Sequence, residues 1–101
     1  MINSKNNPVE WALLIIQMQD AQESLSDLIQ NMSETGKIDE VEFQIEIIHI
    51  YHHLNTAWNS RNRDREPTDG DFETEEKFPK DIDLSNFQRA SRAKTARGDI
   101  E

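Results

Sequence analysis

Cysteine is absent from this 101-residue chain, and glycine and proline occur only three times each. Without cysteine the chain can form neither disulfide cross-links nor thiolate metal sites. The three glycines are far apart, so there is no glycine-rich loop of the kind that binds phosphate groups. No Gly-x-Ser-x-Gly motif or cysteine nucleophile is present. We therefore expect a protein that is not an enzyme and uses no cofactor.

Long apolar runs are also missing. The longest is Ala12–Ile16, which is far too short to cross a bilayer. The N-terminus lacks a basic stretch followed by the apolar core of a signal peptide. We expect a soluble, cytoplasmic protein that does not enter membranes. Apolar residues make up only 35% of the chain and the mean hydropathy is -0.84, so its core should be small and marginal by itself.

Negative charge dominates, with a formal net charge of -9. Residues 64–83 hold nine acidic and three basic side chains, whereas residues 84–101 carry two acidic and four basic ones. An acidic surface repels phosphate backbones, which disfavours direct nucleic-acid binding. The basic end at residues 89–97 is interpreted as pairing with the acidic segment or as solvated.

Two long helices are predicted in the first part of the chain. The first, at about 8–32, begins with the N-cap candidate Asn7 and with Pro8, and Gly36 stops it. Apolar or small residues follow a spacing of three and four, which is typical of a helix that keeps one seam against another helix. That seam comprises Trp11, Leu14, Met18, Ala21, Leu25, Leu28 and Met32.

The second helix is predicted at about 39–62, with Asp39 as its cap and Pro67 beyond its end. Its seam comprises Phe43, Ile47, Ile50, Leu54 and Ala57. Residues 43–50 could also be an alternating strand, but the wider window follows helical spacing. The predicted fold class is all-α. Because the connection between the helices is short, they should form an antiparallel hairpin over residues 1–63.

Each helix carries a second apolar stripe that one hairpin cannot cover. These stripes comprise Val9, Ala12, Leu13 and Ile16 on the first helix, and Val41, Ile45 and Ile48 on the second. A homodimer of hairpins, forming a four-helix bundle, would bury them. The tail folding over the stripe, or a different protein, would serve the same need.

Residues 64–101 are predicted to be an acidic linker and tail, extended or weakly helical, with a short basic end. Proline, glycine, aspartate and glutamate dominate the first part of this segment. Phe72 and Phe78 interrupt the acids, a pattern often found in segments that bind a protein. A capping-box pattern from Ser85 predicts a short helix at 85–97.

Aromatic, amide and guanidinium groups gather at the end of the second helix, which should lie beside the start of the first. This proposed contact surface comprises Trp11, Asn55, Trp58, Asn59 and Arg61. Tryptophan and arginine are enriched at binding hot spots. The alternative interpretation is that the tryptophans cover the end of the core and the polar groups solvate it.

One helix face carries Glu42, Glu46, His49 and His53, spaced by four, three and four residues. A Glu-x-x-His unit also occurs in bundles that bind two metal ions. In such bundles the ligands point into the core, whereas this face should lie toward solvent. We therefore interpret the four residues as surface pairs and assign no metal site.

The sequence as a whole predicts a small non-enzymatic interaction or regulatory module. It would act through a dimeric helical hairpin and an acidic tail, and its partners would be itself and an unidentified protein. One rival is a metal-binding carboxylate–histidine bundle. The other is an acidic inhibitor or nucleic-acid mimic that binds a basic target.

Overall fold

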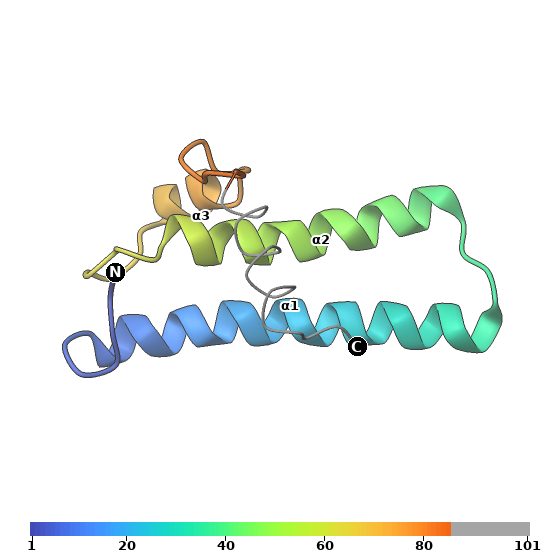
Figure 1. The fold of residues 1–101 in the computed structure, drawn as a ribbon, viewed down its shortest axis with the longest axis horizontal. Coiled ribbons are helices and arrows are strands. Elements are labelled where there is room, and N and C mark those ends of the chain that lie inside the picture. The colour runs from blue at the N-terminus through green and yellow to red at the C-terminus, as the bar shows by residue number, and fades with distance from the viewer. Residues whose placement is uncertain (86–101) are drawn as a thin grey trace.

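The structure is a computed structural model that describes residues 1–85. It contains α1 (Pro8–Thr35), α2 (Glu40–Asn59) and α3 (Asp69–Glu75), and no strand occurs in the described part of the chain. The first two helices run antiparallel and side by side as a hairpin (Figure 1). The all-α prediction is therefore confirmed. The basic end, and the helix predicted at 85–97 apart from Ser85, lie outside the described residues.

The first helix starts at Pro8 as predicted, but its predicted cap is wrong. Asn7 makes no side-chain hydrogen bond to the helix end. Its Oδ1 instead accepts a hydrogen bond from the backbone N–H of Asn3 at 3.4 Å, so the side chain stabilises the preceding turn. At the other end Gly36 has a φ of 72°, and its N–H bonds to the carbonyl of Met32 at 2.9 Å. This left-handed conformation ends the helix, whose last residue is Thr35, three residues beyond the predicted end at 32.

The second helix begins as predicted and ends earlier. The carboxylate of Asp39 accepts hydrogen bonds from the N–H groups of Val41 and Glu42 at 3.1 and 3.3 Å. Beyond Ser60 the chain turns, because the N–H of Arg61 bonds to the carbonyl of Trp58 at 3.2 Å. The helix therefore stops at Asn59 and not at the predicted residue 62.

The core of the hairpin is thin and has two parts. Ile2, Leu14 and Ala57 form one cluster, and Ala21, Leu28 and Ile50 form the other. None of the large side chains in residues 1–85 is completely buried. A core of this size leaves most of the apolar surface of the hairpin in contact with solvent.

A third of the predicted seam is not buried between the helices, which corrects the prediction. Met18, Leu25, Phe43 and Leu54 remain 48%, 43%, 38% and 40% exposed. Each residue turns a helix by about 100°, so positions three and four apart fall on either side of the contact line. One neighbouring helix covers the side that holds Leu14, Ala21 and Leu28, and leaves the other side open.

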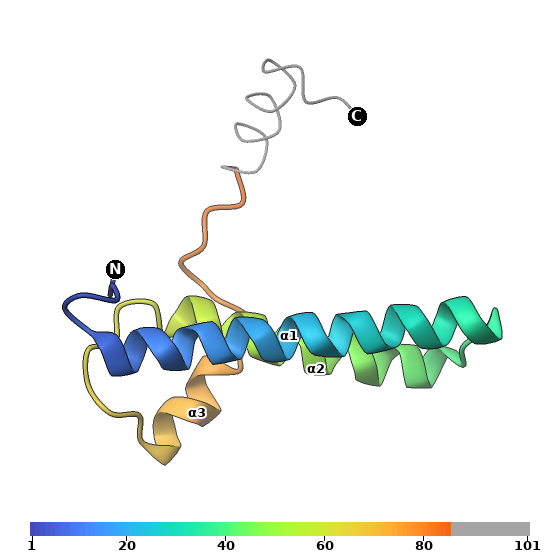
Figure 2. The ribbon, with the colours of Figure 1, turned by 90° about the horizontal axis from the view of Figure 1, so that it is seen from below.

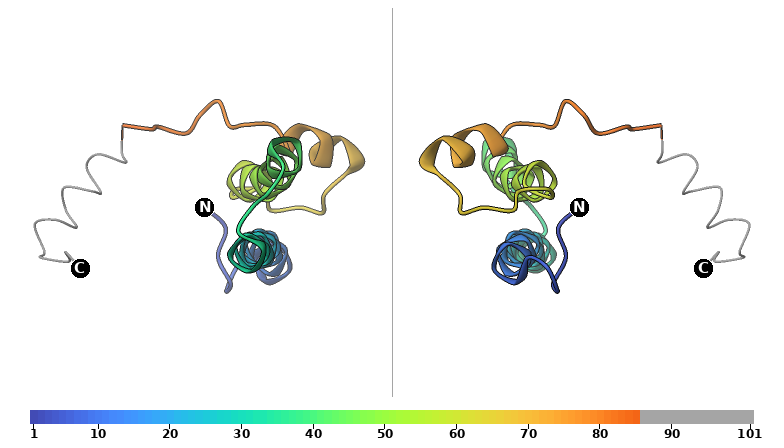
Figure 3. Two further views of the ribbon diagram at one scale, coloured as in Figure 1. Left: turned by 90° about the vertical axis from the view of Figure 1, so that its right-hand side faces the viewer. Right: turned by 90° about the vertical axis from the view of Figure 1, so that its left-hand side faces the viewer.

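The acidic segment is more structured than predicted, because α3 packs against α2. Thr68 caps it in a reciprocal capping box with Asp71. Figures 2 and 3 show α3 on one side of the hairpin and the N-terminal segment on the other. After α3 the chain crosses the outer surface of α2 toward the side of the N-terminus (Figure 3).

The second apolar stripes are exposed as predicted. Val41 and Ile45 on α2 are 62% and 61% exposed, and Val9 on α1 is 62% exposed. Leu13 is half-buried, since it lines a small cavity with Phe72 of α3. Docking of α3 therefore covers only a small part of these stripes.

Candidate interaction surface

One side of the hairpin presents large apolar side chains from both helices. We call this surface the open face; Leu13 and Gln17, which line a cavity with Phe72 of α3, lie on the other side of α1. It comprises Ile15, Met18, Leu25 and Ile29 of α1 and Phe43, Tyr51 and Leu54 of α2. These side chains are between 38% and 55% exposed. Large exposed apolar patches are common where soluble proteins bind one another.

Between its two ends the open face carries no formal charge. The residues that helical spacing places on it, from Trp11 to Ile29 and from Phe43 to Trp58, include no Asp, Glu, Lys or Arg. The acids of α1 lie on its other sides, with Glu23 and Asp27 both exposed. Depletion of charge at the centre of a surface patch distinguishes interface cores from ordinary surface.

Trp11 and Trp58 lie at the same end of the open face, as predicted. With Met1, Ile15, Met18 and other residues they line an apolar pocket of about 320 Å³. The guanidinium carbon of Arg61 lies 3.9 Å from the centroid of the Trp58 ring. That geometry is a cation–π contact and fixes the orientation of the indole.

Asp81 holds this aromatic end from the segment that follows α3. Its carboxylate accepts one hydrogen bond from Trp58 Nε1 and another from the Arg61 guanidinium, both at 2.9 Å. The indole hydrogen bond, followed by the one from Arg61, lowers the pKa of Asp81 below its ordinary value. The predicted contact residues Trp58 and Arg61 are therefore already bound by their own chain.

Asn55 and Asn59 also bind within the chain. The Asn55 amide donates to the carbonyl of Glu76 at 2.9 Å. The Asn59 amide donates to the carbonyls of Glu75 and Lys77 at 3.0 and 2.9 Å. The last carbonyls of a helix lack partners within it, so both amides satisfy the C-terminal end of α3. These two residues therefore anchor α3 to α2 through their amide groups.

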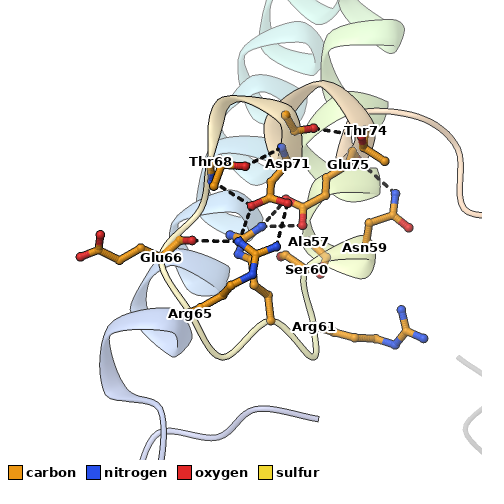
Figure 4. A network of polar contacts seen from close by, with 12 residues as sticks. Ala57, Asn59, Ser60, Arg61, Arg65, Glu66, Thr68, Asp71, Thr74 and Glu75 are labelled. Atoms are coloured by element: carbon orange, nitrogen blue, oxygen red, sulfur yellow. Dashed lines mark hydrogen bonds and ion pairs between the residues drawn. The ribbon is translucent and has the colours of Figure 1, made fainter.

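Ion pairs hold the start and the end of α3 (Figure 4). Arg63 pairs with both oxygens of Glu75, and only 12% and 9% of the two side chains are exposed. Arg65 donates to the carboxylate of Asp71 at 2.6 and 3.0 Å. The Arg65 hydrogen bond, with others from Thr68, holds the pKa of Asp71 well below its ordinary value. Both pairs connect the loop after α2 to α3.

The predicted tail anchors lie in different places. Phe72 is 46% exposed and lies over a cavity with Leu13 and Gln17 of α1. Phe78 is 61% exposed in the segment after α3. Phe72 therefore helps to dock α3, whereas Phe78 remains available to a partner.

The Glu–His face forms no metal cage. His53 Nδ1 lies 2.9 Å from the side-chain oxygen of Gln17, and its ring meets that of His49 edge-on at 4.7 Å. Glu42 and His49 are exposed and Glu46 is half-buried. Within residues 1–85 no three His, Asp or Glu side chains come close enough together to hold a metal ion.

Several residues that organise this surface were not predicted from the sequence. Ile2 is buried against Leu14 and Ala57, and its N–H bonds to the carbonyl of Arg61 at 2.9 Å. Glu75 and Asp81 were counted only as part of an acidic run. A lone isoleucine near the N-terminus and a lone buried carboxylate in such a run give no periodic signal.

No helix in residues 1–85 combines the length and apolar composition needed to cross a membrane. Comparisons of the chain with protein-family models, curated proteins and solved structures gave no match. What the chain does must therefore be inferred from its own geometry.

Proposed function

We propose that the chain is a small non-enzymatic interaction module whose hairpin pairs with a second copy to form a four-helix bundle. The single observation that carries this proposal is the open face. The exposed fractions of its side chains correspond to on the order of 700 Å² of accessible surface, and a standard interface takes about 800 Å² from each partner.

The weakness of the hairpin core supports the same conclusion. Six apolar residues are buried in the described part of the chain, and they divide into two small clusters. Covering seven further apolar side chains would enlarge that core across both copies. Pairing of identical surfaces through a two-fold axis is the commonest way in which soluble proteins achieve this.

A dimer through the open face leaves other apolar groups for a different protein. Val41, Ile45 and Ile48 lie on the outer surface of α2, and Phe78 lies beside the acidic segment. We assign the contact with a second kind of protein to this outer surface. The amides of Asn55 and Asn59 are left out of it, because they bind α3.

The spacing of the acidic and histidine side chains favours a binding module over the metal-binding rival. His53 Nδ1 lies 2.9 Å from the side-chain carbonyl oxygen of Gln17, a partner that could also orient a metal ligand. Within residues 1–85, however, no three His, Asp or Glu side chains come close enough together to hold a metal ion.

Light scattering on the purified chain tests the dimer. We expect a mass near twice 11.8 kDa. Ile29→Lys should weaken the dimer by at least about 100-fold, because about 1.5 kcal/mol of apolar burial is lost in each of two symmetric copies. Gln30→Lys changes the charge equally on an exposed position outside the open face and should leave the mass unchanged. A wild-type mass of one chain at high micromolar concentration would refute the proposal.

A further inference from the structure

The apolar side chains of the open face are arranged symmetrically about its middle. This symmetry limits how two copies can pair, and the inference drawn from it rests on the dimer proposed above. Within the hairpin, Leu14 shares a cluster with Ala57, and Ala21 shares one with Ile50. Moving one residue toward the C-terminus of α1 therefore corresponds to moving one residue toward the N-terminus of α2. In this register the point between residues 21 and 22 of α1 faces the point between residues 49 and 50 of α2.

On α1 the large side chains lie at nearly equal distances from the point between residues 21 and 22. Met18 and Leu25 are each about 5 Å from it along the helix, and Ile15 and Ile29 are about 10 and about 11 Å from it. All four are 39–55% exposed. Gln22, a smaller and uncharged residue, lies at the centre.

The middle of the α2 pattern lies between residues 50 and 51, about 1.5 Å beyond the point between residues 49 and 50. Leu54, and Ile47 at the edge of the core cluster of Ile50, are each about 5 Å from this middle, and Phe43 and Trp58 are about 11 Å from it. Tyr51 lies at the centre and is 52% exposed. Both helices therefore repeat the same order of large side chains when they are read from either end.

A two-fold interface needs this property, since residue i must fit residue j and residue j must fit residue i. We infer that two hairpins pair through their open faces about a two-fold axis that crosses α1 between residues 21 and 22 and α2 beside residue 50. In this arrangement α1 lies antiparallel on α1 of the second copy, and α2 lies antiparallel on its α2. Met18 then meets the second copy's Leu25, and Phe43 meets its Trp58. Every neighbouring pair of helices is antiparallel, which suits the helix dipoles.

The ends of the hairpin favour this orientation over one in which like ends meet. At the tryptophan end the N-terminal segment lies against the hairpin, held by the bond from Ile2 to Arg61, and Met1 is 74% exposed. The segment around Asp81 also reaches this end (Figures 2 and 3). Like ends would bring two such segments together. The antiparallel orientation places each one beside the tip of the other hairpin, where the chain only turns from α1 to α2.

Charge fits the same arrangement. Each chain carries -9, and pairing through the uncharged face keeps the acids of both copies on the outside. The remaining repulsion acts between exposed groups, so salt should screen it. The dimer should therefore become tighter between low and physiological salt.

A single cysteine tests the position of the axis, and the natural chain contains none. A residue can cross-link to its own copy only if it lies beside the two-fold axis, because a disulfide needs Cα atoms within about 7 Å. Gln22→Cys should form a covalent dimer under mild oxidation. Glu23→Cys, one residue farther round the helix and also exposed, is the matched control. We expect at least about 10-fold more covalent dimer for Gln22→Cys, and Met18→Cys combined with Leu25→Cys should cross-link as well.

The outcomes separate this inference from the proposal beneath it. If light scattering shows a dimer but Gln22→Cys does not cross-link, the axis is wrong and the dimer stands. Cross-linking only when Gln22→Cys is combined with Tyr51→Cys would mean that α1 packs on α2 of the second copy, which overturns the inferred axis. A monomer that leaves both cysteines uncoupled, including one whose own residues 86–101 cover the open face, would overturn both.

Discussion

The ion pair between Arg63 and Glu75 gives the sharpest stability prediction. Replacing Glu75 with glutamine keeps the size of the side chain and removes its charge. Arg63 would then keep a positive charge at a site where 12% of its side chain is exposed, and its Nε already lacks a hydrogen-bond partner within residues 1–85. Loss of one member of a buried pair costs about 3 kcal/mol, since the other charge remains unpaired.

That cost should fall on the docking of α3 more than on the whole hairpin. The pair joins α3 to the loop after α2, while the hairpin has its own two core clusters. Hydrogen exchange measures such local opening. Exchange of the amides of residues 69–77 should accelerate about 100-fold in Glu75→Gln, since 1.36 kcal/mol corresponds to a factor of ten. Exchange in α1 should change little.

Glu76→Gln provides the control, because Glu76 is the exposed neighbour and makes no ion pair among the described residues. Its substitution should alter exchange in α3 by less than about 2-fold, as expected for an exposed group. Equal exchange rates in the two variants would show that the buried pair does not dock α3. In that case the amides of Asn55 and Asn59 would be its main anchors.

Two further predictions concern pH and the turn between the long helices. The pKa of Asp81 is lowered in the folded chain from an ordinary value near 3.8. The ionised carboxylate therefore stabilises the fold fully above that value, and this stabilisation is lost as the pH falls through the folded pKa. Tryptophan fluorescence should change below pH 4 in the wild type, and this change should be absent in Asp81→Asn. Gly36→Ala should lower the free energy of unfolding, measured in urea, by about 1 kcal/mol, because a left-handed conformation strains alanine. No neighbouring atom would clash with the added methyl group. An unchanged stability would therefore mean that the turn has rearranged.

The sequence alone determined the two long helices and the place where the chain reverses. The signals are local: Pro8 at a first turn, Gly36 in a left-handed conformation, and Asp39 bonded to the next N–H groups. Capping and backbone conformation depend on residues within one helical turn, so they can be read directly from the order of residues. The excess of apolar side chains over what one hairpin can bury was also evident from spacing.

Only the tertiary structure decided which apolar side became the core and how the acidic segment is used. Helical spacing made Leu14 and Met18 equivalent, yet Leu14 is buried and Met18 is 48% exposed. The difference arises because a second helix covers a stripe narrower than the apolar one. Asn55 and Glu75 likewise form contacts across 21 and 12 residues of chain. Such contacts depend on where α3 lies in space, which no local pattern specifies.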